Sequence, residues 1–347
     1  MNFPRSVACV AVAVTACASS LAHGATTILP SLRTDLGFTQ HWSGNGLNVG
    51  SRVWGVHADG GKVYATGDSG LNYSTDGGTT WNYFQNDSFR YQSKKVYASG
   101  NSIYTATDFG VRYSADGGST WDTADSTHGL STDGGVWDVY ANGSTVYAAT
   151  EYGIAISNDG GASWTNRYIQ RLGGGGVTGV RSVRVQDGRI YASSNYGLCT
   201  SSDNGLSWQI QNLSQYLGVN EISVSGQRLY VGGGGGLHMS TDGGSTWSLA
   251  WTAPSATLDG AAWTVYRVGD TLYGSYGSQG RSGTMISTNG GATWTQYSET
   301  AYTVFATESN VYFAGGGMLL IGSPVPAPGA IALLGVAGAV SGRRRRG

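Results

Sequence analysis

The sequence predicts an all-β fold: a single seven-bladed β-propeller with four-stranded blades, closed by an N-terminal strand. Two repeated phrases lead to this prediction. An eight-residue phrase, called the box below, first reads STDGGTTW at Ser74–Trp81 and recurs five more times. A pair of apolar residues seven positions apart, first Val56 and Val63, occurs seven times with a period of 39 to 44 residues. Such a period with short alternating β segments is typical of propeller blades.

The composition agrees with this fold. The chain has 347 residues with 57 Gly, 40% apolar residues and 12% charged residues, which fits an all-β protein with many turns. The formal net charge is −1 and, apart from one terminal run, the charges are scattered, so we expect no nucleic-acid partner. The histidines, at positions 23, 41, 57, 128 and 238, lack metal-ligand spacing, and no metal or cofactor is predicted.

Cysteine use adds little. Cys9 and Cys17 lie near the N-terminus, which leaves Cys199 alone in the body of the chain. One thiol supports neither a disulfide framework nor a cysteine metal site. We interpret Cys199 as a small half-buried strand residue, with a catalytic thiol as the alternative.

Residues 1–25 predict a secretory signal peptide. Arg5 precedes an apolar run from Val7 to Ala16, and Ala22–Ala25 offers a small-residue cleavage site after Gly24. The alternative is a lipoprotein leader, in which Val14–Cys17 would place a lipidated cysteine at the mature N-terminus. Both interpretations predict an exported protein.

Residues 324–347 combine a proline-rich linker, an apolar run and the arginines Arg343–Arg346. The apolar run Gly329–Ser341 would measure about 20 Å as a helix, against about 30 Å for a bilayer core. This order of parts resembles the PEP-CTERM sorting signal of bacterial surface proteins, with Pro326-Ala327-Pro328 where that family has Pro-Glu-Pro. The resemblance implies transient membrane association and cleavage by an exosortase-type enzyme. A permanent C-terminal anchor is the alternative.

Residues 26–323 are expected to form the seven blades. In the first blade we expect strands near Trp54–Ala58, Val63–Thr66, Leu71–Ser74 and Thr80–Phe84, with the box on the last turn. The seventh blade has only three strands, between residues 302 and 321, and no box follows them. Arg33–Trp42 aligns as a degenerate box, so the N-terminal strand near Thr39–Trp42 is expected to complete this blade and to remove the exposed edges.

The box pattern S-x-D-x-G-x-[ST]-W resembles the Asp-box, or BNR, repeat of sialidase-like propellers, and the resemblance covers nearly the whole body of the chain. In the first box, Asp76 can accept backbone N–H bonds that tie the hairpin, and Gly78 can take a positive φ. Trp81 is expected to be buried between sheets. We therefore interpret the boxes as structural, through Asp76, Asp116, Asp159, Asp203, Asp242 and Asn289.

Candidate ligand-binding residues stand at the starts of the first strands. The strand order puts those starts and the turns between the second and third strands on one face, and the boxes on the opposite face. Aromatic and charged side chains around one pore would suit a polar ligand that stacks, such as a sugar. The alternative is that they pack blade against blade around a wet channel. The candidates are Trp54, Lys94, Trp137, Asp138, Arg181, Glu221, Trp263 and Tyr302.

The sequence favours a binding protein over an enzyme. A sialidase needs an arginine triad, a Tyr with an activating Glu and an acid/base group, and the Arg-Ile-Pro signature of that family is absent. We therefore predict no catalytic residue and a non-catalytic, exported binding or scaffold protein for polysaccharide or a surface protein. Two alternatives stay open: a sialidase-like glycoside hydrolase, and a chaperone-like scaffold similar to photosystem II assembly-factor propellers, for which the arginines between Arg167 and Arg184 are a modest hint.

Overall fold

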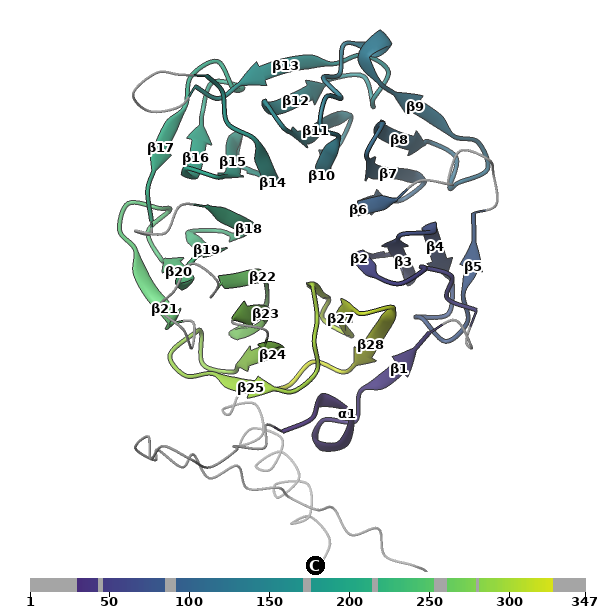
Figure 1. The fold of residues 1–347 in the computed structure, drawn as a ribbon, viewed down its shortest axis with the longest axis vertical. Coiled ribbons are helices and arrows are strands. Elements are labelled where there is room, and N and C mark those ends of the chain that lie inside the picture. The colour runs from purple at the N-terminus through teal and green to yellow at the C-terminus, as the bar shows by residue number, and fades with distance from the viewer. Residues whose placement is uncertain are drawn as a thin grey trace, which may run out of the picture.

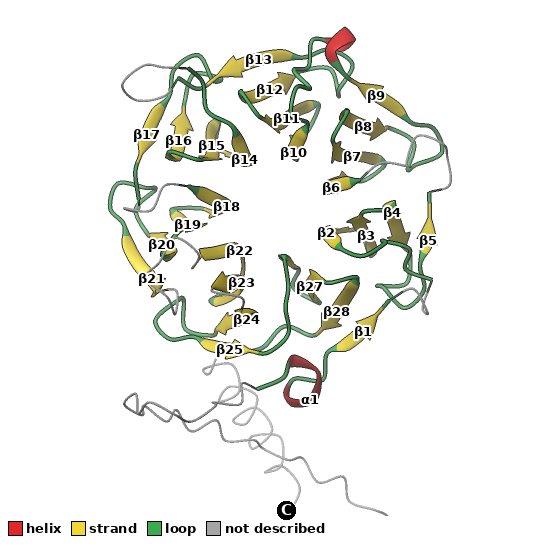
Figure 2. Ribbon diagram, in the orientation of Figure 1, coloured by secondary structure: helices red, strands yellow, loops and turns green. Residues whose placement is uncertain are grey.

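The computed structural model describes residues 30–42, 46–84, 92–170, 176–213, 218–252, 261–278 and 281–326. Seven four-stranded antiparallel sheets stand around a central axis like the blades of a propeller (Figures 1 and 2). The predicted seven-bladed β-propeller is therefore confirmed. The expected signal peptide, and the apolar run and arginines of the 324–347 segment, lie outside the described residues.

The strands of each blade are called A to D from the channel outward, and in blades 1 to 6 they are consecutive in the chain. Blades 1 to 3 consist of β2 (Val53–Asp59), β3 (Lys62–Gly67), β4 (Gly70–Ser74) and β5 (Asn82–Tyr83); β6 (Ser93–Ser99), β7 (Ser102–Thr107), β8 (Gly110–Ser114) and β9 (Asp122–Ala124); and β10 (Val136–Asn142), β11 (Thr145–Thr150), β12 (Gly153–Ser157) and β13 (Thr165–Tyr168). A short 3₁₀ turn, Ser126–His128, follows β9.

Blades 4 to 6 follow the same order. They consist of β14 (Val180–Gln186), β15 (Arg189–Ser194), β16 (Gly197–Ser201) and β17 (Gln209–Gln211); β18 (Val219–Ser225), β19 (Arg228–Gly233), β20 (Gly236–Ser240) and β21 (Ser248–Thr252); and β22 (Ala261–Val268), β23 (Thr271–Ser278), β24 (Arg281–Ser287) and β25 (Thr295–Tyr297). Blade 7 has β26 (Thr303–Ala306), β27 (Val311–Gly315) and β28 (Met318–Gly322), with β1 (Thr39–His41) as its outer strand.

The core lies between adjacent blades. One cluster joins Tyr104 and Ala106 of blade 2 to Val139 and Ala148 of blade 3. The middle strands β11 and β12 are buried along almost their whole length because each of their faces packs against a neighbouring sheet. Stacking the blades in a ring thus buries both faces of every sheet.

An N-terminal strand closes the ring, as the sequence predicted. β1 pairs antiparallel with β28, with Thr39 opposite Ile321 and His41 opposite Leu319. Glu299 holds the segment before β1, because its carboxylate accepts hydrogen bonds from the Ser31 hydroxyl at 2.5 Å and the Leu32 N–H at 2.9 Å. The first and last parts of the propeller are therefore joined within one sheet.

The segment before β1 differs from the degenerate box that the alignment suggested. It forms the short helix α1 (Leu32–Asp35), and the Asp35 carboxylate accepts the backbone N–H of Ser31 at 2.7 Å. In the other boxes the aspartate binds the residue four positions later, whereas the hydroxyl of Thr39 here donates to the Ile321 carbonyl at 3.1 Å. The segment supplies a strand but not a box turn.

Each of the six boxes forms the same hydrogen-bonded turn between strands C and D. In the first, Asp76 Oδ1 accepts the N–H of Thr80 at 2.9 Å and the hydroxyl of Ser74 at 2.7 Å. The Ser74 hydroxyl accepts the Gly78 N–H at 2.7 Å, and Gly78 has φ of +102°. A Cβ on Gly78 would collide with Ile321 Cδ1, so glycine also lets this turn approach blade 7.

Trp81 is buried between blades 1 and 7, as expected, but not every box tryptophan is buried as deeply. Trp81 and Trp164 are each 7% exposed, and the other four are only partly buried. Five of the six indole N–H groups donate to the carbonyl of the glycine three residues earlier, as Trp164 does to Gly161 at 2.8 Å. The tryptophan therefore closes its own turn as much as it fills the space between blades.

The chain stays attached to the propeller beyond residue 323. The Val325 N–H donates to the Tyr273 hydroxyl at 2.8 Å, and the Val325 carbonyl accepts from the Thr271 hydroxyl at 3.1 Å. The start of the proline-rich linker therefore lies on blade 6. Within the described ranges, no helix has the length and apolar character needed to cross a bilayer.

Candidate functional site

Six of the seven A strands carry a β-bulge near their first residue. In β2 the register with β3 shifts between Val53 and Gly55, which leaves Trp54 out of the ladder. A bulge bends the strand and re-aims the side chain that it frees. In blade 7, Tyr302 directly precedes β26 and its N–H donates to the Ala314 carbonyl at 2.7 Å. The bulged residues are Trp54, Lys94, Trp137, Arg181, Asn220 and Trp263.

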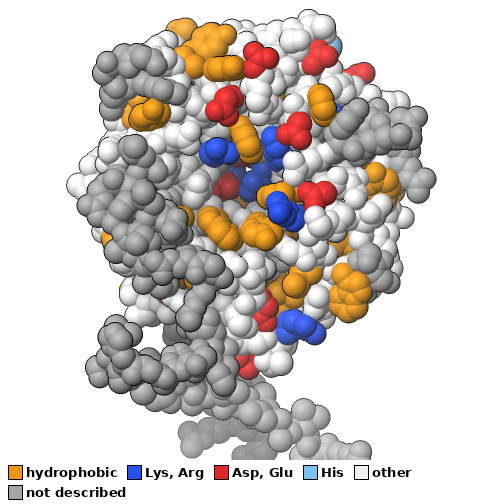
Figure 3. All heavy atoms as spheres, in the orientation of Figure 1, with side chains coloured by type: hydrophobic (Ala, Val, Ile, Leu, Met, Phe, Trp, Pro, Cys, Tyr) orange, Lys and Arg blue, Asp and Glu red, His pale blue; other side chains and the backbone are white. Residues whose placement is uncertain are grey.

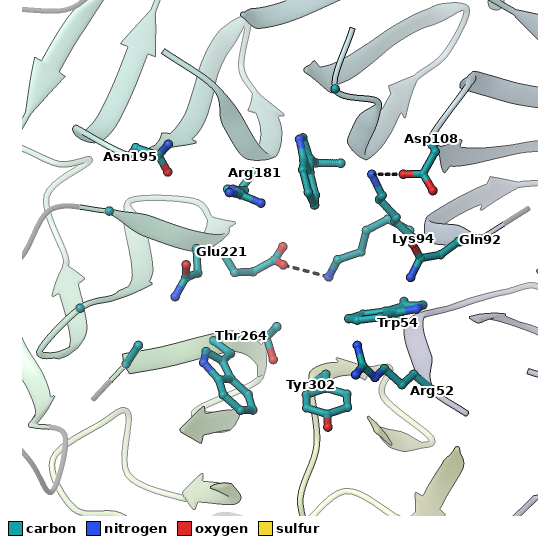
Figure 4. Close-up of a pocket in the computed structure, with 18 residues that line it drawn as sticks. Arg52, Trp54, Gln92, Lys94, Asp108, Arg181, Asn195, Glu221, Thr264 and Tyr302 are labelled. Carbon is teal, nitrogen blue, oxygen red and sulfur yellow. Dashed lines mark hydrogen bonds and ion pairs between the residues drawn. The ribbon is translucent and has the colours of Figure 1, made fainter. Parts of the chain in front are cut away.

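These six side chains and Tyr302 line a cavity of about 900 Å³ at one end of the channel (Figure 4), called the channel mouth below. It opens on the face of the B–C turns, opposite the boxes. On that face the Ser69 N–H of a B–C turn donates to the Val49 carbonyl of the loop before blade 1. Lys and Arg side chains gather around the central hollow, with hydrophobic side chains beside them (Figure 3).

One side of the channel mouth is aromatic. The Tyr302 ring stacks on Trp54, with centroids 6.0 Å apart and planes at 28°, and contacts Trp263 at 5.6 Å. The Arg52 guanidinium lies 5.1 Å from the Trp54 ring centroid. Three blades thus contribute one continuous aromatic surface, called the aromatic arc (Trp263, Tyr302 and Trp54).

The other side of the channel mouth is cationic. Lys94 Nζ lies 3.8 Å and the Arg181 guanidinium 4.2 Å from the centroid of the Trp137 ring. Lys94 also pairs with Asp108 of a B–C turn at 2.7 Å. Arg181 is exposed and, among the described residues, has no carboxylate within ion-pair distance. This set, Lys94, Trp137 and Arg181, is called the cationic arc.

Acidic B–C turns fix the orientation of the aromatic side chains. The indole N–H of Trp54 donates to Asp68 Oδ1 at 2.7 Å, and that of Trp137 to Glu151 Oε2 at 3.3 Å. Burial raises the pKa of Asp68, but hydrogen bonds from Ser51 and Trp54 lower it by more, so its net pKa is below the usual value. The turns predicted to share this face therefore hold the mouth in shape.

Below the mouth, four charged side chains form a network between it and a second cavity. Glu221 binds Lys95 at 2.9 Å and Arg184 at 2.7 Å, and Arg184 also binds Asp138 at 2.6 Å. Asp138 further accepts the backbone N–H of Val183 at 3.1 Å. Burial raises the pKa of Glu221, but Lys95 and Arg184 lower it more, so the net shift is downward. This network, Lys95, Asp138, Arg184 and Glu221, is called the waist.

A second cavity of about 310 Å³ lies beyond the waist, toward the box face. A belt of rings surrounds it: Tyr140 contacts Tyr97 at 5.1 Å, Tyr97 contacts His57 at 4.9 Å, and Phe305 contacts both His57 and Tyr266 at 4.7 Å. Burial lowers the pKa of His57 to about 4 and raises that of Tyr97 to about 12, so both are neutral at pH 7. Among the described residues that line this cavity, Arg267 is the one charged side chain outside the waist, and it lies 3.3 Å from Asp270.

The structure separates the candidate residues that the sequence grouped together. Trp54, Lys94, Trp137, Arg181, Trp263, Tyr302 and Glu221 line the channel mouth. Asp138 does not, because it is 2% exposed and belongs to the waist. Lys95 and Arg184, the cationic half of the waist, were missing from the candidate set. The sequence feature that could have identified them is a charged residue inside an otherwise apolar strand, as in Val183-Arg184-Val185.

The remaining expectations concern other parts of the chain. Cys199 lies fully buried in β16, deeper than the half-buried position expected, and burial raises its pKa to about 11. Arg167 lies on the outer strand β13, so it does not join Arg181 and Arg184 in one patch. Within the described ranges, no group of three or more His, Cys, Asp or Glu side chains is arranged to hold a metal ion.

No family model and no curated protein sequence matches the chain. Among solved structures, it is similar to YCF48 bound to D1 peptide, with 19% identity, a TM-score of 0.65 and coverage of 86% of this chain and 98% of that one. It is also similar to the extracellular domain of the putative hybrid two-component system BT3049 from B. thetaiotaomicron, with 17% identity, a TM-score of 0.59 and coverage of 79% and 40%. An ancestral GH74 enzyme is similar at 16% identity, a TM-score of 0.53 and coverage of 78% and 48%. At these identities the likeness shows the propeller fold.

Proposed function

We propose that this protein is an exported, non-catalytic binding protein of the cell surface or extracellular matrix, and that the channel mouth holds its ligand. One observation carries the proposal: aromatic rings and cations from several blades converge on a cavity of about 900 Å³. That volume is within the usual range for ligand sites. Stacking on the aromatic arc and hydrogen bonding to Arg181 can act on one ligand at the same time.

The carboxylates of the mouth support binding over hydrolysis. Glycoside hydrolysis needs a protonated carboxylic acid of raised pKa beside a second carboxylate. Glu221 has a lowered pKa because of Lys95 and Arg184, and Asp108 is ion-paired with Lys94. We therefore assign no catalytic residue. The alternative is a sialidase-like hydrolase, and release of a cleaved product from a bound oligosaccharide would support it.

Both ends of the chain support export. The leader in residues 1–25 and the PEP-CTERM-like order of residues 324–347 fit a surface protein that an exosortase-type enzyme cleaves after transient membrane association. Intact-mass measurement of the protein from its native host tests this. We expect a form without the leader and without Arg343–Arg346. A membrane-bound form that keeps these arginines would instead indicate a permanent anchor, and a lipid on Cys17 would indicate a lipoprotein leader.

The first candidate ligand is a polysaccharide, and a surface protein is the second. The six boxes support grouping the chain with Asp-box propellers, and the similar YCF48 structure, of which this chain covers 98%, contains a D1 peptide. A propeller of this size can therefore hold a polypeptide segment. This favours a scaffold that binds a partner protein, in the manner of an assembly factor, as the alternative to carbohydrate.

A paired variant experiment tests the site. The full chain is screened on glycan and peptide arrays beside a mouth variant, Trp54→Ala with Trp263→Ala, and a box variant, Asp203→Asn. We expect the mouth variant to lose the ligands that the wild type retains although it is folded at the temperature of the assay, while the box variant keeps them. Loss in the box variant alone would move the site to the opposite face and overturn the proposal.

A further inference from the structure

We propose that the ligand of the channel mouth is an acidic oligosaccharide, in which a sugar ring lies on the aromatic arc while a carboxylate of the same chain binds Arg181. This inference rests on the proposed function, since it names the ligand class of the same cavity. It depends on three features of the mouth: the kind of apolar surface, the hydrogen-bonding groups and the balance of charge.

The apolar surface of the mouth is aromatic. Among the described residues that line it are Trp54, Trp137, Trp263 and Tyr302, but no Val, Leu, Ile, Met or Phe, and Ala261 is the one aliphatic side chain. Ligand pockets are usually lined mainly by hydrophobic side chains. A site whose one aliphatic side chain is an alanine gives little to a peptide's Leu or Val, whereas the C–H face of a sugar ring packs well on a flat ring.

The polar lining suits hydroxyl groups. Asn195 and Asn220 line the cavity beside Asp108, so amide groups and a carboxylate acceptor face the same space. Figure 4 labels Asn195 and Asp108 at its rim. Each sugar hydroxyl both donates and accepts, and a mixed lining can satisfy both roles. The Asp108 side chain is 44% exposed, so its carboxylate has room for a further hydrogen bond besides the one to Lys94.

The charge balance favours an anion. Four cationic side chains, Arg52, Lys94, Lys95 and Arg181, and two anionic ones, Asp108 and Glu221, line the cavity of a chain whose formal net charge is −1. Lys94 pairs with Asp108 and Lys95 with Glu221, and Asp68, which accepts the Trp54 indole N–H, interacts electrostatically with Arg52. Arg181 is therefore the lining cation that can pair with a carboxylate of the ligand. A guanidinium binds a carboxylate through two parallel hydrogen bonds, and the stack on Trp137 orients that of Arg181.

The test compares acidic and neutral sugars of equal length. Hexasaccharides of galacturonate, mannuronate and glucuronate are titrated into the full chain by calorimetry, each beside its carboxyl-reduced form. We expect at least one acidic hexasaccharide to bind about tenfold more tightly than its reduced form, because only the carboxylate can pair with the guanidinium. This preference should shrink as salt is added.

Two variants locate the effect. Arg181→Gln should bring the acidic and reduced forms within about twofold of each other, because the charge-assisted hydrogen bonds are lost. The control, Arg228→Gln, removes an exposed arginine at the start of β19 that pairs with Asp270, and it should leave the preference unchanged.

Three outcomes would overturn the inference. The first is that no acidic hexasaccharide binds more tightly than its reduced form, and the second is that Arg181→Gln keeps the preference. The third is that the wild type binds peptides instead of sugars and that the Trp54→Ala/Trp263→Ala variant does not bind these peptides. This third result would overturn the inference but support the proposed function. If neither sugars nor peptides bind at the mouth, the inference and the proposed function both fail.

Discussion

The channel mouth and the waist are built from neighbouring residues of the same A strands, but the mouth offers an arginine that no carboxylate of the described residues pairs with, whereas the charges of the waist are paired with one another. Arg181 at the mouth is exposed and stacks on Trp137, whereas Arg184, three residues later, binds both Asp138 and Glu221. The bulge near residue 181 separates the two levels, because it turns one side chain out of the ladder while Ser182 returns to it. One strand thus carries both an available charge and a fully paired one.

This difference shows how to tell binding charges from structural ones in a propeller channel. A charge whose hydrogen bonds are completed by fixed partners has little to offer a ligand, since binding would first have to break those bonds. The waist also spans the ring, because its members come from blades 2, 3, 4 and 5. Lys95 and Glu221 of the waist also reach the floor of the mouth, but because their charges are paired we expect changes at the waist to affect mainly stability. Changes at the aromatic and cationic arcs should affect mainly binding.

The largest effect is expected at the waist. Glu221→Ala removes the shared acceptor of Lys95 and Arg184 and leaves them with Asp138 as the remaining carboxylate of the network. Breaking a buried ion pair from one side typically costs about 3–5 kcal/mol. The free energy of unfolding from urea denaturation measures it, with Arg181→Ala as the mouth control, expected to change stability by about 0.5 kcal/mol or less. Equal losses in the two variants would contradict the distinction between mouth and waist.

Two tryptophans sharpen the same comparison. Trp164 is 7% exposed between blades and its N–H donates to Gly161, so Trp164→Ala should cost about 3 kcal/mol of unfolding free energy. Trp263 is only partly buried at the mouth, so Trp263→Ala should cost about 1 kcal/mol but weaken ligand binding. Urea denaturation and array binding, measured on both variants, check the pair. The prediction is wrong if Trp164→Ala loses the ligand at conditions where it is fully folded.

Much of this architecture could be predicted from the sequence because it rests on local, repeated chemistry. The box needs only Ser, Asp, Gly and Trp within eight residues. The apolar pairs indicate strands whose two faces are both buried. The closing strand followed from counting strands in the last blade. The register of the bulges was beyond the sequence, because a bulge depends on how each A strand packs against its neighbours. Asp138 was therefore grouped with the mouth, and Lys95 and Arg184 were missed, since their partners are brought together only by the curvature of the ring.

His57 in the lower channel should make stability depend on pH. Burial is the main cause that lowers its pKa from 6.5 to about 4. Between these values the unfolded chain binds a proton that the folded protein does not, so stability falls as pH falls from about 6.5 to 4, by at most about 3 kcal/mol. His57→Gln should reduce this dependence, measured as the difference in unfolding free energy between pH 7 and pH 4.5. An unchanged difference would show that His41 and His238, whose pKa values are also lowered, account for it.

The smallest effect is expected at the boxes, where charge is exposed but fixed by hydrogen bonds. Bonds from the Thr246 hydroxyl and N–H, and from the Ser240 hydroxyl, lower the pKa of Asp242 to about 2, so its contribution is complete above about pH 4 and is lost as pH falls toward 2. Asn289 shows that an amide can replace the carboxylate: its Oδ1 accepts the Thr293 N–H at 2.9 Å, and its Nδ2 donates to the Thr293 hydroxyl at 2.8 Å.

Asp242→Asn should therefore leave the melting temperature nearly unchanged at pH 7 and make it fall less than that of the wild type between pH 4 and pH 2.5. Asp242→Ala, which keeps neither acceptor nor donor, should lower the melting temperature at both ends of this range. Scanning calorimetry at pH 7, 4 and 2.5 measures all three proteins. If Asp242→Asn and the wild type lose the same amount below pH 4, the box carboxylate does not titrate against these hydrogen bonds. The boxes would then be stabilised by the backbone turn and the tryptophan. Paired charges would contribute to the stability of the protein at the waist but not at the boxes.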